Sequence, residues 1–408
     1  MIHPAQKSDF VVYDQPGWGS FTYNFPIAGG IRKRSDGRLV LQFETADEIC
    51  CNDDFYYAHY HRVVMDSRDE GGSWKEIQPK WAHDIPLQLP DGTLLEVVES
   101  RRLRSSRENL AHFKRVGLEH LWHEDCHVCW DLWPESMVDE LRRKGLNVWT
   151  RQGDCIPPGV VATAPPTPLV MRRSFDSGVT WQQQTLALPE IQRFAHFGTC
   201  FSGGVVMSDG VVLLPFYGLD KRSVRPGEFT FEAMDVCVLR SDDRGDRWQV
   251  ATIAQGGAGD WFSETCLASL PTGRVVAMIR AGEIYCSASD DGGSTWATPQ
   301  PTGIYGEPLH LTCLASGNLL CTYAHRKAPG GIRATLSRDN GVTWNAGGEV
   351  ILRDDAPASD YIGGPCSVQL SDESILSVYN LVGDPILGDG RHHCYIAASR
   401  YTESFLLG

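Results

Sequence analysis

Short apolar stretches separated by tight turns recur along the whole chain. In each copy an apolar, β-rich stretch runs into a turn containing Gly, Asp or Ser and is followed by a second such stretch, as in "GGVVMSDGVVLLPF" and "LTCLASGNLLCTY". Two such runs joined by a tight turn are typical of a β-hairpin. The pattern therefore predicts six hairpins, centred near Asp36, Asp91, Asp209, Thr272, Ser316 and Asp372.

A second repeated phrase, Ser-x-Asp-x-Gly-x-x-Trp, follows five of the six hairpins. It begins at Ser67, Ser174, Ser241, Ser289 and Ser337; after the sixth hairpin, "HHCYIAASRYTES" keeps only the Ser. We expect its Asp to accept hydrogen bonds from backbone N–H groups of its own turn and its Gly to supply a left-handed backbone. The Trp would then cover the outer strands. We interpret the phrase as scaffold, without a part in the chemistry.

One hairpin followed by a second hairpin that carries the phrase gives four strands. Six such units predict an all-β fold, a six-bladed β-propeller in one domain over residues 1–408. The N-terminal "DFVVYD" is expected to close the ring as the outer strand of the last blade. Residues 100–168 interrupt blade two, and we expect this partly helical insertion, which contains "PESMVDELRRKGL", to cap one face.

Composition narrows the choice of partners. The chain of 408 residues has a net charge of −14, which argues against a nucleic-acid or anionic-membrane partner.

"MIHPAQKSDF" has no secretion signal, so we expect a cytoplasmic protein, or a secreted one if a leader was trimmed. Many of the thirteen cysteines stand in apolar runs such as "TCLASL", which favours free thiols over a disulfide framework.

The five phrases, known as Asp-boxes or BNR repeats, make this pattern resemble the sialidase (neuraminidase) superfamily. The resemblance implies a sialidase-like propeller and an exo-acting glycoside hydrolase whose site lies away from the boxes. It further implies three arginines that clamp a substrate carboxylate, a Tyr nucleophile assisted by a Glu, and an Asp acid/base. In "SETCLASLPTGRVVAMIR", Glu264 and Arg280 match the Glu and one arginine. In "AHRKAPGGIRATLS", Arg326 and Arg333 both fit the next arginine, and spacing does not choose between them.

Other members of that set are matched only partly. The first arginine is missing from "YNFPIAGGIRKR", where Arg32 is a nearby substitute. "DYIGGPCSVQL" puts Gly364 where the Tyr belongs and Tyr361 three residues earlier. For the acid/base, "TADEICCNDDF" supplies Asp47, Asp53 and Asp54 without deciding among them.

The residue types themselves support a glycosidase on an oligosaccharide or glycoconjugate substrate. Such an enzyme needs a proton donor and a nucleophile or base on either side of the anomeric carbon, which Glu264 and a blade-one aspartate would supply. Guanidinium groups bind carboxylates bidentately, so Arg280 with Arg326 or Arg333 would suit an acidic terminal sugar. The alternatives are a structural Glu264–Arg280 ion pair and an Arg333 that only pairs with the acid of a neighbouring blade.

Histidines suggest a rival chemistry. His83, His196 and His310 each stand just before an inner hairpin, where side chains approach the propeller axis. A polysaccharide lyase acting on uronic-acid glycans needs a neutral His or Tyr base and an arginine that neutralises the carboxylate. A non-catalytic glycan-binding propeller is the third alternative.

The insertion also contains a group of metal-ligating residue types. "HLWHEDCHVC" includes His120, His123, Cys126, His127 and Cys129, residue types that bind zinc, at a spacing that fits no standard structural zinc site. We therefore predict no metal, and since no phosphate-binding Gly-rich loop opens a helix, no cofactor either.

Overall fold

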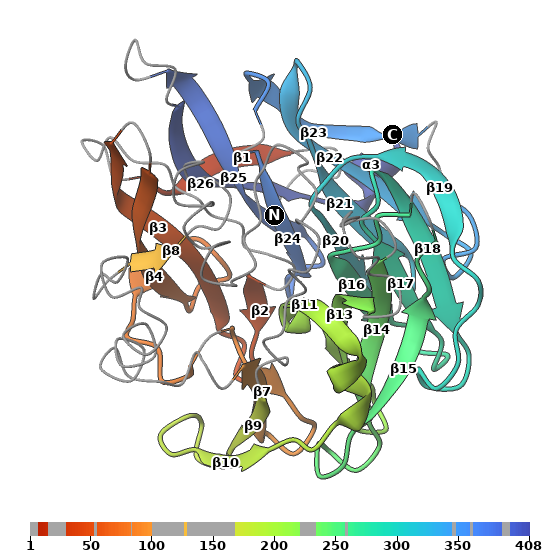
Figure 1. Cartoon of the computed structure of the whole chain (residues 1–408). Helices are drawn as coiled ribbons and strands as arrows, with labels where there is room; N and C mark the ends of the chain where they lie inside the picture. The colour runs from red at the N-terminus through yellow and green to blue at the C-terminus, as the bar shows by residue number, and fades with distance from the viewer. Residues whose placement is uncertain are drawn as a thin grey trace.

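The computed structural model describes residues 7–14, 30–52, 55–82, 84–99, 126–128, 168–220, 234–257, 260–344, 348–359, 362–385 and 392–408. It is a six-bladed β-propeller, as the hairpin pattern predicts (Figure 1). Each blade is a twisted antiparallel sheet, and the sheets stand around a central axis. The first strand of each sheet lies next to that axis.

The blades, from the innermost strand outward, have the following bounds. Blade one has β2 (Ile31–Lys33), β3 (Leu39–Asn52), β4 (Phe55–Ser67) and β5 (Lys75–Glu76), and blade two has β6 (Leu87–Gln88), β7 (Leu94–Glu99), β9 (Leu169–Ser174) and β10 (Gln182–Thr185). Blade three has β11 (Phe194–Thr199) and β12 (Val205–Val206), then β13 (Val212–Asp220), β14 (Met234–Ser241) and β15 (Gln249–Ala254). Blade four has β16 (Thr265–Ser269), β17 (Val275–Ile279), β18 (Glu283–Ser289) and β19 (Gln300–Tyr305).

Blade five has β20 (Leu309–Cys313), β21 (Leu319–His325), β22 (Gly330–Ser337) and β23 (Val350–Ala356), and blade six has β24 (Gly363–Gln369), β25 (Ile375–Pro385), β26 (His392–Tyr401) and β1 (Ser8–Tyr13). The short strand β8 (Cys126–Val128) pairs with β4. Two 3₁₀ turns, η3 (Pro189–Arg193) and η4 (Phe201–Gly203), and the C-terminal helix α3 (Glu403–Leu407) complete the described elements.

The N-terminal strand closes the ring, as predicted. β1 pairs antiparallel with β26, with Ser8 opposite Arg400 and Val11 opposite Ala397 (Figure 1). The hydroxyl of Ser399 donates to Asp9 Oδ1 at 2.5 Å across the same seam. The last blade is therefore built from both ends of the chain.

The core consists of apolar layers between adjacent blades. Blades two and three bury Leu95 against Phe216 and Leu239, and corresponding layers join blades three to four, four to five, five to six and six to one. A smaller layer with Val40, Val64 and Ile85 joins blades one and two within the described residues. Alternating side chains of each sheet thus reach neighbours on both sides, which accounts for the near-continuous apolar runs in the middle strands.

The Asp-boxes have the internal bonding that the sequence predicts. In the blade-four box, the backbone N–H of Thr295 donates to Asp291 Oδ1 at 2.9 Å, and the hydroxyl of Ser289 donates to the same oxygen at 2.8 Å. The backbone N–H of Gly293 donates to Ser289 Oγ at 2.8 Å, and Gly293 has φ of +82°. Trp296 closes the turn by donating its ring N–H to Gly293 O at 3.1 Å.

The boxes also connect neighbouring blades. A Cβ added at Gly293 would lie 2.7 Å from the Leu213 side chain of blade three, and one at Gly341 would lie 2.8 Å from Val276 of blade four. Arg244, in the blade-three box, pairs with Asp91 in the blade-two turn at 3.3 Å. The boxes and the inner hairpin turns therefore share one face of the propeller, which we call the box face.

One sequence expectation falls largely outside the described residues. Of the insertion, the structure describes β8 and residue 168, so the predicted helical cap lies outside the described residues. No helix in the described ranges is long and apolar enough to span a membrane. The cysteines that the structure describes in detail are free thiols, most of them buried, as expected.

Candidate functional site

The face opposite the boxes gathers charged side chains where the inner strands begin. Glu264 immediately precedes β16, and Arg280 immediately follows β17, the antiparallel neighbour of β16. Their backbones bond directly, with Arg280 N–H donating to Glu264 O at 3.1 Å. Glu307 and Arg326 occupy the corresponding places in blade five, before β20 and after β21. We call these four residues the funnel cluster.

The funnel cluster is a continuous ion-pair network across two blades. Arg280 donates from one terminal nitrogen to Glu264 Oε2 at 2.8 Å and from Nε to Glu307 Oε2 at 2.6 Å. Arg326 reaches Glu307 Oε1 at 3.5 Å and donates from Nε to Ile362 O at 3.2 Å. All four side chains are between 18% and 30% exposed, so solvent or a ligand can reach them.

The electrostatics of the cluster favour the charged forms of Glu307 and Arg280. Burial alone would raise the pKa of Glu307, but its hydrogen bond to Arg280 and the charges of Arg280 and Arg326 outweigh burial and lower the pKa. Burial acts to lower the pKa of Arg280, but Glu264 and Glu307 outweigh it and raise the pKa. Both oxygens of Glu307 are engaged by arginines, whereas Glu264 Oε1 has no hydrogen bond from the described residues. Glu264 therefore has an oxygen available to a ligand.

Two aromatic residues beside the cluster were missed by the sequence reasoning. Trp261 is 49% exposed, and the Arg280 guanidinium lies 6.0 Å from the centre of its ring. Tyr217 stands opposite Gly198 in the β11–β13 pairing, and a Cβ at Gly198 would lie 2.2 Å from Tyr217 Cζ. Burial raises the pKa of Tyr217, with the Cys200 thiol and Glu264 adding to the effect and Arg280 opposing it.

Blade three adds a further charged group on the same side of the propeller. Arg193 immediately precedes β11. Its guanidinium lies 3.2 Å from Asp235 Oδ2 and 3.7 Å from Asp220 Oδ2. The same group lies over the Phe194 ring, 4.6 Å from the ring centre. Both aspartates are about 95% buried, with side-chain exposures of 5%. The sequence analysis singled out none of these three, because no repeat marks them.

The structure separates the two arginines between which spacing could not choose. Arg326 belongs to the funnel cluster. Arg333, in β22, is 4% exposed and lies 3.4 Å from Glu349 of its own blade, with further bonds to the backbone oxygens of Pro329 and Arg353. Arg333 therefore forms a structural ion pair with Glu349, which belongs to the same blade and not to a neighbouring one.

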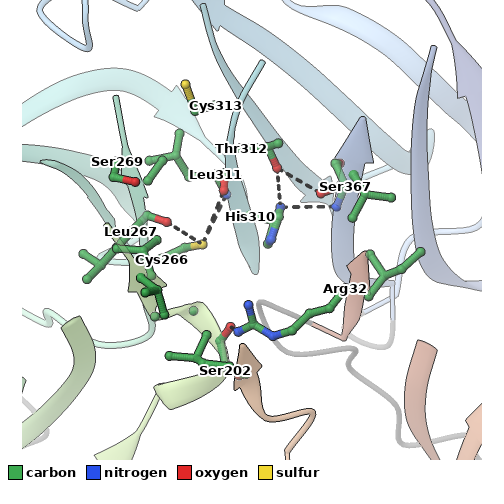
Figure 2. Close-up of a pocket in the computed structure, with 18 of the residues that line it drawn as sticks. Arg32, Ser202, Cys266, Leu267, Ser269, His310, Leu311, Thr312, Cys313 and Ser367 are labelled. Atoms are coloured by element: carbon green, nitrogen blue, oxygen red, sulfur yellow. Dashed lines mark hydrogen bonds between the residues drawn. The ribbon is translucent and has the colours of Figure 1, made fainter. Parts of the chain in front are cut away.

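Arg32 and His310 lie away from the funnel cluster, in the central channel. Arg32 extends from β2 and His310 from β20 into the same space (Figure 2). The backbone N–H of Ser367 donates to His310 Nδ1 at 3.2 Å. Because Nδ1 accepts, the proton of the neutral ring sits on Nε2. Burial, with a smaller effect of Arg32, lowers the pKa of His310 to about 3, so at neutral pH this ring is a hydrogen-bond donor and has no lone pair left to act as a base.

Several predicted site residues lie wholly or partly outside the description. His83, Asp53, Asp54 and Tyr361 lie outside the described residues, and Asp47 and His196 are placed only as backbone positions in β3 and β11. Of the metal-ligating types in the insertion, Cys126 and His127 are placed as backbone in β8; His120, His123 and Cys129 fall outside the description. Among the described residues, no group of three or more His, Cys, Asp or Glu side chains could hold a metal ion.

Comparison with known proteins agrees with this architecture. Residues 158–361 match the family described as BNR repeat-like domain. A Dyadobacter fermentans protein of unknown function is similar in structure, with a TM-score of 0.60, 22% identity, and coverage of 96% of this chain and 97% of that chain. A comparison with curated protein sequences found no match.

Sialidases share the fold at lower identity. The NanB sialidase from Streptococcus pneumoniae has a TM-score of 0.54 and 11% identity over 99% of this chain and 71% of its own. The intramolecular trans-sialidase from Ruminococcus gnavus, solved with oseltamivir carboxylate, has a TM-score of 0.54 and 14% identity over 95% and 98%. At these identities the likeness establishes a sialidase-like fold.

Proposed function

This chain belongs to the family of BNR repeat-like domains, and from that premise we propose that it is an exo-acting glycoside hydrolase that removes a terminal polar or acidic sugar at the funnel cluster. The observation that carries the proposal is the pairing of Glu264 with Arg280 at a partly exposed position where inner strands begin. A carboxylate held on one oxygen and available on the other is suited to act at an anomeric carbon.

Arg280, Tyr217 and a blade-one aspartate support Glu264 in this proposal. Arg280 fixes the Glu264 carboxylate through Oε2, which leaves Oε1 to act as nucleophile, as base, or through a neighbouring hydroxyl. The charge of Glu264 acts on the Tyr217 hydroxyl, and burial, the larger effect, raises the pKa of Tyr217 and keeps it protonated at neutral pH. A blade-one aspartate, Asp47 or Asp54, is proposed as the second catalytic group on the opposite side of the sugar.

Trp261 and Arg326 are proposed to hold the substrate. The exposed indole of Trp261 offers a flat apolar face beside Arg280 against which a sugar ring can stack. The funnel cluster contains two arginines and two glutamates, so its formal charge is zero. A substrate carboxylate would therefore have to displace part of the Glu307 pairing from Arg326, where the contact of 3.5 Å is the longest in the network. The Ruminococcus gnavus trans-sialidase with this fold is solved with oseltamivir carboxylate, and a leech trans-sialidase with 2,7-anhydro-Neu5Ac, which supports testing acidic sugars first.

The test is a product assay over sialosides, uronic-acid glycans and neutral aryl glycosides. We expect the wild-type protein to release a free terminal sugar from one class, without new ultraviolet absorbance, and Glu264→Gln to abolish the release. Glu283→Gln is the matched control, because Glu283 belongs to the same blade and bonds to Gly303 N–H and Tyr305 instead of the funnel cluster. Its release of sugar should equal that of the wild type.

Two other outcomes would overturn the proposal. A rise in ultraviolet absorbance reports the conjugated double bond of an unsaturated uronate and would assign the protein to the lyases. That result would place the base on a group other than His310, whose Nδ1 already accepts a hydrogen bond. A panel without any product, combined with a ligand-induced rise in the unfolding temperature, would identify a glycan-binding propeller.

A further inference from the structure

The central channel encloses a cavity of about 360 Å³ that is separate from the funnel cluster. All six innermost segments contribute to it, from β2 of blade one to β24 of blade six. Residues near the strand starts, such as Ile31 and Cys266, are buried, whereas Lys33 is exposed and Cys313 is half-buried near the strand ends. The exposure rises toward the box face, so the cavity opens on the side opposite Glu264 and Arg280.

The lining of this cavity is basic. Arg32, Lys33 and Arg34 all border it, and none of the described residues that line it is an aspartate or a glutamate. This contrasts with the net charge of −14 for the whole chain. A cavity with cationic walls in an acidic protein concentrates anions.

Arg32 is the deepest of the three cations and lacks a carboxylate partner among the described residues. It donates from one terminal nitrogen to the backbone oxygen of Ser202 at 2.6 Å, and its Nε is buried without a hydrogen-bond partner there. Burial lowers the pKa of Arg32, and the thiols of Cys266 and Cys366 and the carboxylate of Asp84 oppose this only partly. A half-buried guanidinium that has a buried, unpaired N–H and no carboxylate partner is stabilised when an anion binds to it.

His310 supplies a second donor to the same space. Its Nδ1 accepts from Ser367 N–H and lies 3.1 Å from Thr312 Oγ1, which fixes the ring and leaves the Nε2–H group for the cavity. Figure 2 shows Arg32 and His310 extending from two different strands into one space. Closer to the mouth, Arg34 donates to Pro86 O at 3.0 Å, so this guanidinium also has only a backbone oxygen as its hydrogen-bonded partner among the described residues.

We propose that the central channel is an anion site, in which Arg32 and His310 bind a small oxyanion, a phosphate or the carboxylate of a small acid, that enters from the box face past Arg34. The terminal nitrogen of Arg32 that does not bond to Ser202 and the histidine Nε2–H are the primary donors, and Arg34 adds charge at the entrance. This site is independent of the proposed hydrolase activity, because it shares no residue with the funnel cluster.

The test is isothermal titration calorimetry of the full chain with inorganic phosphate and, separately, with glucuronate. A titration with chloride at the same ionic strength is the reference. We expect saturable binding of one or both oxyanions with one ion per chain, and a loss of at least about tenfold in affinity in Arg32→Gln, because a charge-assisted donor pair is removed. Loss of binding in Arg32→Gln assigns the ion to the channel, because Arg32 is not part of the funnel cluster. Arg68→Gln, which removes an exposed arginine elsewhere in blade one, controls for net charge.

A second variant keeps the test decisive if Arg32→Gln does not fold. His310→Gln retains an N–H donor but not the geometry of the ring, and Arg34→Gln removes the charge at the mouth; each should weaken binding. Phosphate binding alone would assign the site to a tetrahedral oxyanion, and glucuronate binding alone to a carboxylate. Absence of saturable binding of both ions, or equal affinity in wild type, Arg32→Gln and His310→Gln, would overturn the proposal.

Discussion

The hydrogen bonds of Arg280 and Arg326 determine which of the two glutamates keeps a carboxylate oxygen without a hydrogen bond from the described residues. Arg280 bonds Glu264 through one oxygen and Glu307 through another, while Arg326 occupies the remaining oxygen of Glu307. A planar guanidinium makes both bonds in fixed directions, which a lysine ammonium does not reproduce. The orientation of the Glu264 carboxylate therefore depends on the arginine geometry as well as on its charge.

The substitution Arg280→Lys tests this dependence. We expect kcat/KM on the substrate identified by the product assay to fall by roughly 10- to 100-fold, because a lysine holds one glutamate and releases the other. Arg274→Lys is the control, since Arg274 of the same blade binds Asp290 near the box face. Unchanged kcat/KM in Arg280→Lys would remove the cluster from the mechanism.

At the scale of the element, the Asp-box turn joins two blades through its glycine. Gly293 combines φ of +82° with a Cβ position 2.7 Å from Leu213 of the preceding blade. Gly273, in the inner hairpin turn of the same blade, has φ of +86° and nothing within 4 Å of its Cβ position. The two glycines share a conformation and differ in contact with the neighbouring blade.

This pair predicts two different stability losses. Gly293→Ala should lower the free energy of unfolding by about 2–4 kcal/mol, from left-handed strain and overpacking together. Gly273→Ala should lower the free energy of unfolding by only about 1–2 kcal/mol, because it adds left-handed strain without overpacking. Denaturant unfolding of both variants measures the difference. Equal losses would mean that the box does not support the blade interface.

The box carboxylates also predict a response to acid. Hydrogen bonds from Thr295 lower the pKa of Asp291 to about 2, and bonds from Thr180 do the same for Asp176. A carboxylate whose folded-state pKa is below its unfolded value of about 3.9 stabilises the fold above that value and stops doing so as pH falls through the folded pKa. Unfolding free energy should therefore decline between about pH 4 and pH 2. Asp291→Asn should show a shallower decline than the wild type or than Asp354→Asn, a substitution outside the boxes; parallel curves would contradict this.

For the whole molecule, the fold could be predicted from sequence because the repeats are local. Each hairpin and each box, such as Ser289 to Trp296, specifies its own turn within a few residues, and six repeats leave few arrangements other than a closed ring. β1 was predicted to close the ring because the sixth blade otherwise lacked an outer strand. These inferences require no knowledge of contacts between distant residues.

The candidate site could be predicted only in part because it depends on contacts between blades. Spacing placed Glu264 and Arg280 together, since one hairpin separates them. Spacing could not separate Arg326 from Arg333, because the distinction depends on where the strands end. Arg326 directly follows β21, whereas Arg333 lies in the middle of β22. Tyr217 was missed because its position over Gly198 follows from the pairing of β11 with β13, in an inner strand that η4 interrupts.

The measurement that tests the central claim most directly is kcat/KM of Glu264→Gln relative to the wild type on the sugar substrate found in the panel, with the unfolding midpoints of both proteins recorded. We predict a loss of roughly 10²–10⁴-fold, the usual contribution of a general acid or base, with little change in the midpoint. Retention of kcat/KM within about twofold, far below that predicted loss, in a folded Glu264→Gln protein would contradict a catalytic role for Glu264 and move the chemistry away from the funnel cluster.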